Sequence, residues 1–212
     1  MALAEPLWHE RLFQQPAEVQ DDNADVSAIV SEHLRRSIVS YPTAQAPGTI
    51  IVDTPNTYLY YVLPGGKAIR YGIGVGRESF TWSGVKTVDR LSQWPDWIPP
   101  AEMIQRQPYL PRFMAGGPQN PLGARAIYLG GTLYRIHGTN APSTIGKHVS
   151  SGCIRMLNED VIDLYARVRI GTKVVVLPMT APQAPNGESA VRPSGGRAPV
   201  HVTGTVQAFG IY

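Results

Sequence analysis

The sequence predicts a mainly β domain that contains one short helix in its second half and is preceded by an amphipathic helix. Short apolar runs separated by glycine, proline and asparagine turns between residues 49 and 137 predict the strands. Apolar residues at helical spacing in 21–40, and a helix start at Asn158, predict the two helices. The 212 residues suffice for one substantial domain, and 43% hydrophobic with 17% charged residues is an ordinary globular composition.

The N-terminal region has the pattern of an appended helix followed by a linker. Within 21–40 the apolar positions recur at three- and four-residue intervals, at Val26, Ile29, Val30, Leu34 and Ile38. Asp21, Asp22 and Asp25 stand near the end of this helix where the dipole is positive. Residues 41–48 then break the periodicity with two prolines and a glycine. We therefore expect a helical extension and linker over 1–47.

The main domain, expected over 48–178, begins as a series of short strands. The candidate strands are 49–52, 58–62, 68–74, 125–129 and 133–137. Turn residues separate them at Pro55-Asn56, Pro64-Gly65-Gly66 and Gly130-Gly131, which is the pattern of antiparallel hairpins. Residues 82–121 are rich in Trp, Pro and Gly with little periodicity. A segment of this length either forms a wall of a binding site or contains strands that the pattern hides.

The second half of the domain is predicted to contain a helix and a final strand. Asn158 is a candidate N-cap, the two acidic residues after it suit a first turn, and the helix is expected to stop at Gly171. Residues 173–177 have the pattern of a buried strand. The region 179–212 forms a C-terminal extension: it is rich in Pro, Gly and Ser up to residue 198, which predicts mobility, and 200–212 alternates as a strand does.

Composition excludes several classes of protein. The formal charge of +3 is spread along the chain, with no basic cluster beyond Arg35-Arg36 and residues 192–197, so nucleic acid is not an expected partner. Cys153 is the single cysteine, which rules out an intrachain disulfide and a thiolate metal cluster, and we expect no metal or cofactor. No run approaches the roughly 18–20 apolar residues of a membrane span. Residues 1–11 are too charged for a secretory signal, so we expect no export signal in this chain.

One stretch carries a set of residues suited to acyl transfer through sulfur. It reads Ile136-His137-Gly138-Thr139-Asn140 and, after a short gap, Ser150-Ser151-Gly152-Cys153-Ile154-Arg155-Met156-Leu157-Asn158. That chemistry needs a thiolate, an imidazole that accepts and returns a proton, and backbone N–H donors for an oxyanion. Taken singly, Cys153 could equally be a small buried apolar residue and His137 a structural histidine. The two together, each beside a glycine, favour a nucleophile and its base.

These residues resemble the signature of the L,D-transpeptidases with a YkuD-type catalytic domain. The resembling pattern is His-Gly-Thr, an Ile-Gly pair, then Ser-x-Gly-Cys-Ile-Arg-Met and Asn, and further matches lie upstream at 71–77, 97–100 and 120–123. The resemblance spans about 49–177, and its Ser-Ser-Gly-Cys form is similar to a periplasmic branch from Gram-negative bacteria. Many members carry a histidine where this chain has Ser151. We therefore treat Ser151 as a variant of the motif and not as the mark of a lost active site, and we expect no second histidine to serve the oxyanion hole or to activate the acceptor.

The resemblance implies a β-sandwich-like catalytic fold and a particular reaction. Cys153 attacks the carbonyl of a meso-diaminopimelate residue at position three of a peptidoglycan tetrapeptide stem, and the terminal D-alanine leaves. His137 is the base, and the carbonyl of Gly138 holds its imidazole in the useful tautomer. The oxyanion is expected to rest on N–H groups at Gly152 and Cys153.

The resemblance also suggests which residues contact the substrate. A fixed guanidinium at Arg155 suits a stem-peptide carboxylate, although a structural salt bridge under the cysteine loop explains Arg155 equally well. Substrate contacts are further expected at Gly152, Ser151, Thr139 and Asn158. The aromatic residues Trp94, Trp97, Tyr109 and Phe113 either line a groove or simply pack their proline-rich segment.

The resemblance leaves the second half of the reaction open. The acyl group could pass to another stem, forming a 3–3 cross-link, to an outer-membrane protein or lipoprotein, or to a free D-amino acid. It could pass to water, which would make the protein an L,D-carboxypeptidase, or the fold could serve as a non-catalytic peptidoglycan-binding module. The expected partners are stem peptides in the periplasm, with carbapenems as inhibitors, and the oligomeric state is not predicted.

Overall fold

The computed structural model describes residues 30–77 and 82–179, which form a mainly β fold. The strands are β1 (Ser37–Ser40), β2 (Ile50–Asp53), β3 (Tyr58–Leu63), β4 (Lys67–Gly72), β5 (Val75–Gly76), β6 (Gly84–Gln93), β7 (Arg125–Leu129), β8 (Arg135–His137), β9 (His148–Ser150), β10 (Ile154–Arg155) and β11 (Lys173–Val176). The helical elements are the 3₁₀ turns η1 (Glu32–Leu34) and η3 (Pro142–Thr144) and the α-helices α2 (Ala101–Arg106) and α3 (Asn158–Arg167). The mainly β expectation is confirmed.

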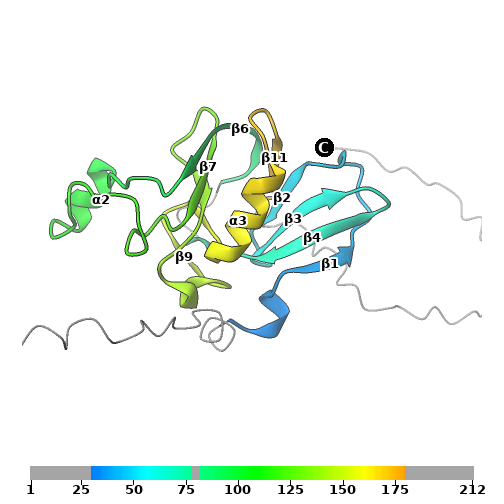
Figure 1. The fold of residues 1–212 in the computed structure, drawn as a ribbon, viewed down its shortest axis with the longest axis horizontal. Helices are drawn as coiled ribbons and strands as arrows, with labels where there is room; N and C mark the ends of the chain where they lie inside the picture. The colour runs from blue at the N-terminus through cyan, green and yellow to red at the C-terminus, as the bar shows by residue number, and fades with distance from the viewer. Residues whose placement is uncertain (1–29, 78–81, 180–212) are drawn as a thin grey trace, which may run out of the picture.

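Most strands join one large sheet whose order is β1-β4-β3-β2-β11-β6-β7-β8-β10 (Figure 1). The antiparallel hairpins β2-β3-β4 and β7-β8 are those that the turn residues predict. At the β3–β4 turn, three residues connect the paired Leu63 and Lys67, and two of them, Gly65 and Gly66, have φ values of +72° and +68°, which glycine adopts without strain.

Three parallel pairings among the described strands depart from the expected meander of hairpins. Strand β11 lies between β2, to which it is parallel, and β6, to which it is antiparallel. Strand β10 runs parallel to β8, and β5 pairs in parallel with β9 in a separate two-stranded sheet. Parallel strands need long connections rather than tight turns, so turn residues in the sequence do not predict these pairings.

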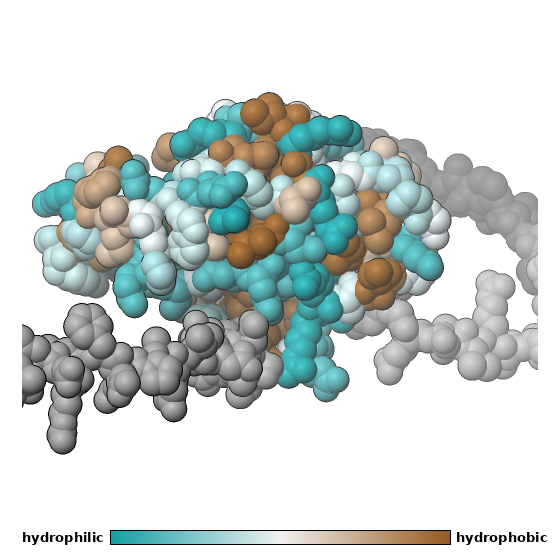
Figure 2. Space-filling view, in the orientation of Figure 1, coloured by the Kyte–Doolittle hydropathy of each residue, from teal (hydrophilic) through white to brown (hydrophobic). Residues whose placement is uncertain are grey.

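The core lies between the two halves of the large sheet, which share β6, and α3 packs within this fold against β7 and β8 (Figure 1). Its largest fully buried side chains come from strands of both halves, from α3 and from the connections between elements, and they include Ile50, Leu59, Tyr71, Ile127, Ile136, Met156 and Leu164. Burying one such aliphatic side chain contributes about 1.5–3 kcal/mol. On the face in Figure 2, hydrophilic residues separate the exposed apolar ones into small groups.

The helix predicted over 21–40 is wrong in its described part. Residues 21–29 lie outside the described residues, and from residue 30 the chain forms η1 and then β1, which pairs antiparallel with the edge of β4. Ile38 is 68% exposed, whereas Val39 packs against the buried cluster around Tyr60. Tertiary pairing of a β-branched stretch thus overrides helical spacing.

The other departures concern element boundaries. The segment 82–121 contains β6 and α2, so it does hide a strand. Helix α3 is N-capped by Leu157, not by Asn158, and it ends at Arg167 because Val168 takes an extended conformation and buries its side chain. Of the mobile segment expected over 178–198, all but the first two residues lie outside the described residues, and so does the strand expected over 200–212. Among the described helices, none has both the length and the apolar character that crossing a membrane requires.

Candidate active site

Strand pairing places the two predicted reactive side chains together. In the parallel pair β8·β10, Ile136 lies opposite Ile154 and His137 opposite Arg155, so Cys153 falls level with Arg135. Because side chains alternate along a strand, Ile136 and Ile154 face the core, where both are buried. Arg135, His137, Cys153 and Arg155 therefore share the other face.

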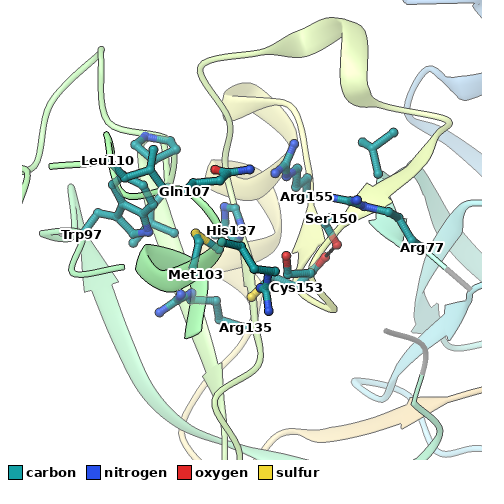
Figure 3. Close-up of a pocket in the computed structure, with 15 residues that line it drawn as sticks. Arg77, Trp97, Met103, Gln107, Leu110, Arg135, His137, Ser150, Cys153 and Arg155 are labelled. Carbon is teal, nitrogen blue, oxygen red and sulfur yellow. Dashed lines mark hydrogen bonds between the residues drawn. The ribbon is translucent and has the colours of Figure 1, made fainter. Parts of the chain in front are cut away.

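That face opens into a cavity of about 250 Å³. Cys153, His137 and Arg155 line it together with Arg77, Trp97, Met103, Arg106, Gln107, Leu110, Pro121, Leu122, Arg135, Val149, Ser150 and Ser151 (Figure 3). Four of these residues are arginines, and no described residue in the lining is Asp or Glu. The cavity is therefore suited to an anionic ligand.

His137 is buried and held as a neutral base. Its Nδ1 lies 2.6 Å from the carbonyl oxygen of Gly138, which can only accept, so Nδ1 carries the proton and Nε2 is left with a lone pair. Burial, and then the charge of Arg135, lower the pKa of His137 to about 3, against partial compensation by backbone hydrogen bonds. The imidazole is thus neutral, in the tautomer that can accept a proton at Nε2.

The backbone of the cysteine turn is fixed by Ser150. Gly152 has φ +99°, a conformation that L side chains rarely adopt. Ser150 Oγ donates to the carbonyl of Cys153 at 2.6 Å and accepts from the N–H of Gly152 at 3.2 Å. In this conformation the Gly152 N–H, which the sequence proposed as an oxyanion donor, already donates to Ser150 Oγ. The Cys153 N–H is the other donor that the sequence proposed.

A second cavity, of about 470 Å³, reaches the same thiol. Cys153, Ser151, Met103, Arg106 and Arg135 line both cavities. The second is otherwise lined by Pro100, Glu102, Gly131, Thr132, Leu133 and Tyr134, so it brings in a carboxylate and more apolar surface. Cys153 is accessible from two sides.

Arg155 is not held in an ion pair by any described residue. Its guanidinium lines the cavity, and its backbone pairs with Gly74. The alternative of a structural salt bridge under the cysteine loop thus finds no partner within residues 30–77 and 82–179.

Two other predicted substrate residues, Thr139 and Asn158, lie outside the lining that the described residues form around the two cavities. Thr139 Oγ1 accepts from the N–H of Ala141 at 3.0 Å, and Asn158 Oδ1 accepts from that of Ala124 at 2.9 Å. A Cβ at Gly138 would collide with Asn158 Oδ1, so glycine is needed there. Both side chains position the loop that follows His137.

Sequence reasoning missed several residues that shape the site. Arg77, Arg135 and Ser150 line the first cavity, and Trp82 donates a hydrogen bond to the carbonyl of Gly152. Arg135 stands two residues before His137, so strand alternation could have placed it on the same face. Of the aromatic candidates, Trp97 lines the first cavity, whereas Trp94, Tyr109 and Phe113 are 44%, 80% and 56% exposed. The groove hypothesis holds for Trp97 alone of these four.

Comparisons with known proteins identify the family of this chain. The family model of the L,D-transpeptidase catalytic domain, YkuD, matches residues 47–176. The probable L,D-transpeptidase ErfK/SrfK of Escherichia coli K12 is 35% identical over 76% of this chain and 58% of its own length. The probable L,D-transpeptidase YbiS of the same strain is 37% identical over 65% of this chain and 48% of its own. The chain thus spans about half the length of these curated relatives.

A solved structure is similar in fold. The L,D-transpeptidase from Mycobacterium smegmatis superposes with a TM-score of 0.50 over 61% of this chain and 58% of that one, at 16% identity. Because the family model covers more than half of the residues, the chain belongs to the YkuD family of L,D-transpeptidase catalytic domains.

Proposed function

We propose that this protein is a peptidoglycan L,D-transpeptidase in which Cys153 is the nucleophile and His137 the base. One observation carries the proposal: the single thiol and a neutral imidazole, oriented by the Gly138 carbonyl, line one arginine-rich cavity. The family membership and the names of the relatives support it.

The acylation step follows from these positions. His137 Nε2 accepts the thiol proton as Cys153 Sγ bonds to the carbonyl carbon of diaminopimelate at position three of a tetrapeptide stem. The intermediate then collapses, the carbon–nitrogen bond to D-alanine breaks, and His137 returns its proton to the departing amine. A thioester on Cys153 and free D-alanine result, with His137 neutral again.

The charge of the cavity favours stem peptides as the acyl donor. Such peptides carry several carboxylates, and the lining offers Arg77, Arg106, Arg135 and Arg155. The Nε of Arg135 is buried and has no hydrogen-bond partner among the described residues, so an acceptor from a ligand would satisfy it. Arginine forks suit carboxylates because they bind them in a bidentate way. We propose Arg155 and Arg135 as the substrate-binding residues, with Ser151 beside the thiol.

The second cavity is our candidate route for the acceptor. It reaches Cys153 from another side, and Glu102 faces the shared Arg106 and Arg135 in its wall, so this cavity carries less positive charge than the first and repels an approaching ammonium group less. We propose an amine acceptor, either another stem or an outer-membrane protein or lipoprotein, with hydrolysis as the competing outcome. Since peptidoglycan lies outside the cytoplasmic membrane, the periplasm is the proposed location.

Intact-mass spectrometry with purified disaccharide-tetrapeptide tests the proposal. Wild-type protein is expected to form a thioester adduct and to release D-alanine, whereas Cys153→Ala forms no adduct. Adding a second amine then separates the two fates of the acyl group, because a transpeptidase diverts product from tripeptide into cross-linked dimer. Absence of both adduct and turnover in correctly folded wild type would instead indicate a binding module.

A further inference from the structure

Trp82 holds the peptide that precedes the nucleophile. Its indole Nε1–H donates to the carbonyl of Gly152 at 3.1 Å, although the two residues are 70 positions apart. The indole is itself stacked on Tyr134, with ring centroids 4.8 Å apart and planes 4° from parallel. We propose that Trp82 is a positioning residue that aims the Cys153 N–H at the oxyanion of the acyl-transfer reaction; this inference rests on the proposed function.

The geometry of a peptide bond links the two groups. In a trans peptide, the carbonyl of one residue and the N–H of the next point in opposite directions. A hydrogen bond that fixes the Gly152 carbonyl therefore also fixes the direction of the Cys153 N–H. Gly152 and Trp82 line a separate small pocket, which shares no lining residue with the two cavities that Cys153 reaches. The Cys153 N–H accordingly points toward the reactive side.

This peptide needs an external restraint. Gly152, at φ +99°, has no side chain to limit its rotation. Ser150 fixes the peptide that follows Cys153, through the Cys153 carbonyl, and it uses the Gly152 N–H. Trp82 fixes the peptide between Gly152 and Cys153. With both planes held and the Gly152 donor used, the Cys153 N–H carries the oxyanion interaction at this turn.

The test compares two reactions of the same thiol. Acylation by p-nitrophenyl acetate passes through a tetrahedral oxyanion, whereas alkylation by iodoacetamide does not. Trp82→Phe keeps a flat ring for Tyr134 and loses the donor. Removing an oxyanion donor outright slows catalysis about 10²–10³-fold, so misaiming one is expected to slow acylation at least about tenfold. Alkylation by iodoacetamide is expected to stay within about twofold of wild type.

Trp94→Phe is the matched control, because Trp94 is 44% exposed and lines neither cavity; both rates should stay at wild-type values. Turnover of the tetrapeptide should show the same loss in kcat with little change in KM. An unchanged ratio of acylation to alkylation in Trp82→Phe overturns the inference, and so does an equal loss in both rates, which marks a structural role. If wild type reacts with the ester but not with the tetrapeptide, the proposed function is contradicted. The comparison of acylation with alkylation in Trp82→Phe remains valid in that case.

Discussion

At the scale of single residues, the protonation state of His137 depends on a neighbour that the motif does not include. Arg135 lies two residues earlier on the same face of β8 and is level with Cys153 in the parallel pairing. After burial, its charge is the largest cause of the lowered pKa of His137. A protonated imidazole cannot accept the thiol proton, so this arginine keeps the base available in mildly acidic conditions.

Replacing Arg135 with glutamine should shift the pH dependence of acylation. The pKa of His137 is about 3, below its ordinary 6.5. The wild-type acylation rate should therefore stay constant as the pH falls through 6.5. Arg135→Gln removes a positive charge, raises the pKa of His137, and should move the acid limb to higher pH. Stopped-flow acylation between pH 3 and 8, a range that reaches down to the wild-type acid limb, measures this shift.

Arg90→Gln is the control for that experiment, because Arg90 stacks on Tyr128 and lines neither cavity at Cys153. Its acid limb should coincide with that of wild type. A wild-type rate that halves near pH 6.5 would contradict the neutral, buried state of His137.

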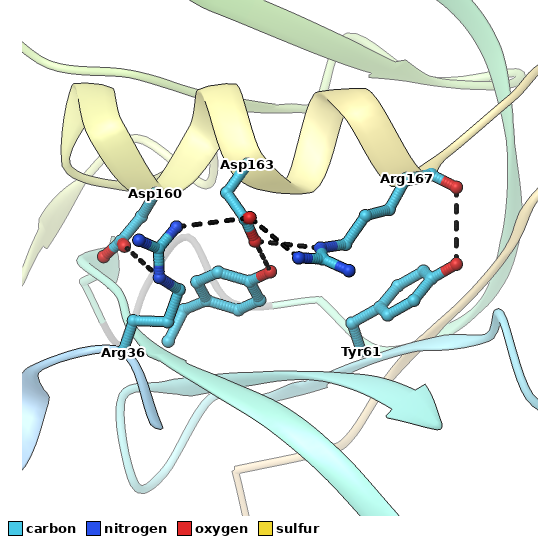
Figure 4. Close-up of polar contacts among 6 residues, drawn as sticks. Arg36, Tyr61, Asp160, Asp163 and Arg167 are labelled. Carbon is cyan, nitrogen blue, oxygen red and sulfur yellow. Dashed lines mark hydrogen bonds and ion pairs between the residues drawn. The ribbon is translucent and has the colours of Figure 1, made fainter. Parts of the chain in front are cut away.

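At the scale of elements, a polar network joins α3 to the segment before β1 and to β4 (Figure 4). Arg36, which precedes β1, lies 3.8 Å from Asp160 and 3.4 Å from Asp163. Asp163 also accepts from the hydroxyl of Tyr71 at 2.5 Å and pairs with Arg167 at 2.9 Å. The N-terminal segment and β4 are thus fastened to the helix that follows the cysteine turn.

Within this network, Asp160 carries an unfavourable buried charge. Its side chain is 2% exposed, and Oδ2 has no hydrogen-bond partner among the described residues. Burial raises the pKa of Asp160 from 3.8 to about 7, and the attraction of Arg36 at 3.8 Å does not offset it. The folded state therefore binds the carboxyl proton of Asp160 more tightly than the unfolded state does. This difference favours folding at low pH, and the favourable contribution to the free energy of unfolding is lost as the pH rises from about 4 through 7.

Asp160→Asn should raise the free energy of unfolding at pH 8, where wild type holds a charged Asp160. One pKa unit corresponds to about 1.4 kcal/mol, and we expect a gain of at least this size at pH 8 with a smaller effect at pH 4.5. Urea unfolding at both pH values measures it. Asp89→Asn serves as the surface control, and an equal change at both pH values would argue against the buried charge.

At the scale of the whole molecule, electrostatic attraction should draw the substrate to the site. The formal charge is only +3, yet four arginines meet in one cavity without an acidic residue among its described lining. Salt screens such attraction, since the Debye length falls from about 10 Å at 0.1 M to about 3 Å at 1 M. KM for an anionic stem peptide should therefore rise several-fold between 50 and 500 mM NaCl, while kcat changes little.

Steady-state kinetics over this range of salt, with iodoacetamide alkylation as a neutral reference, provide the measurement. Arg77→Gln should raise KM at low salt and reduce its dependence on salt, because one of the attracting charges is gone. A KM that does not respond to salt would show that the arginines do not draw the substrate in.

The sequence alone determined the mainly β class and the hairpins, and it predicted the Cys153–His137 pair, because periodicity, turn residues and motifs are local properties. It also indicated the role of the Gly138 carbonyl, through the family resemblance. The position of β1, the parallel pairs β2·β11 and β8·β10, and the contact between Trp82 and Gly152 came only from the tertiary structure. Each joins segments far apart in the chain, and packing of the whole core decides such pairings where near-neighbour preferences do not.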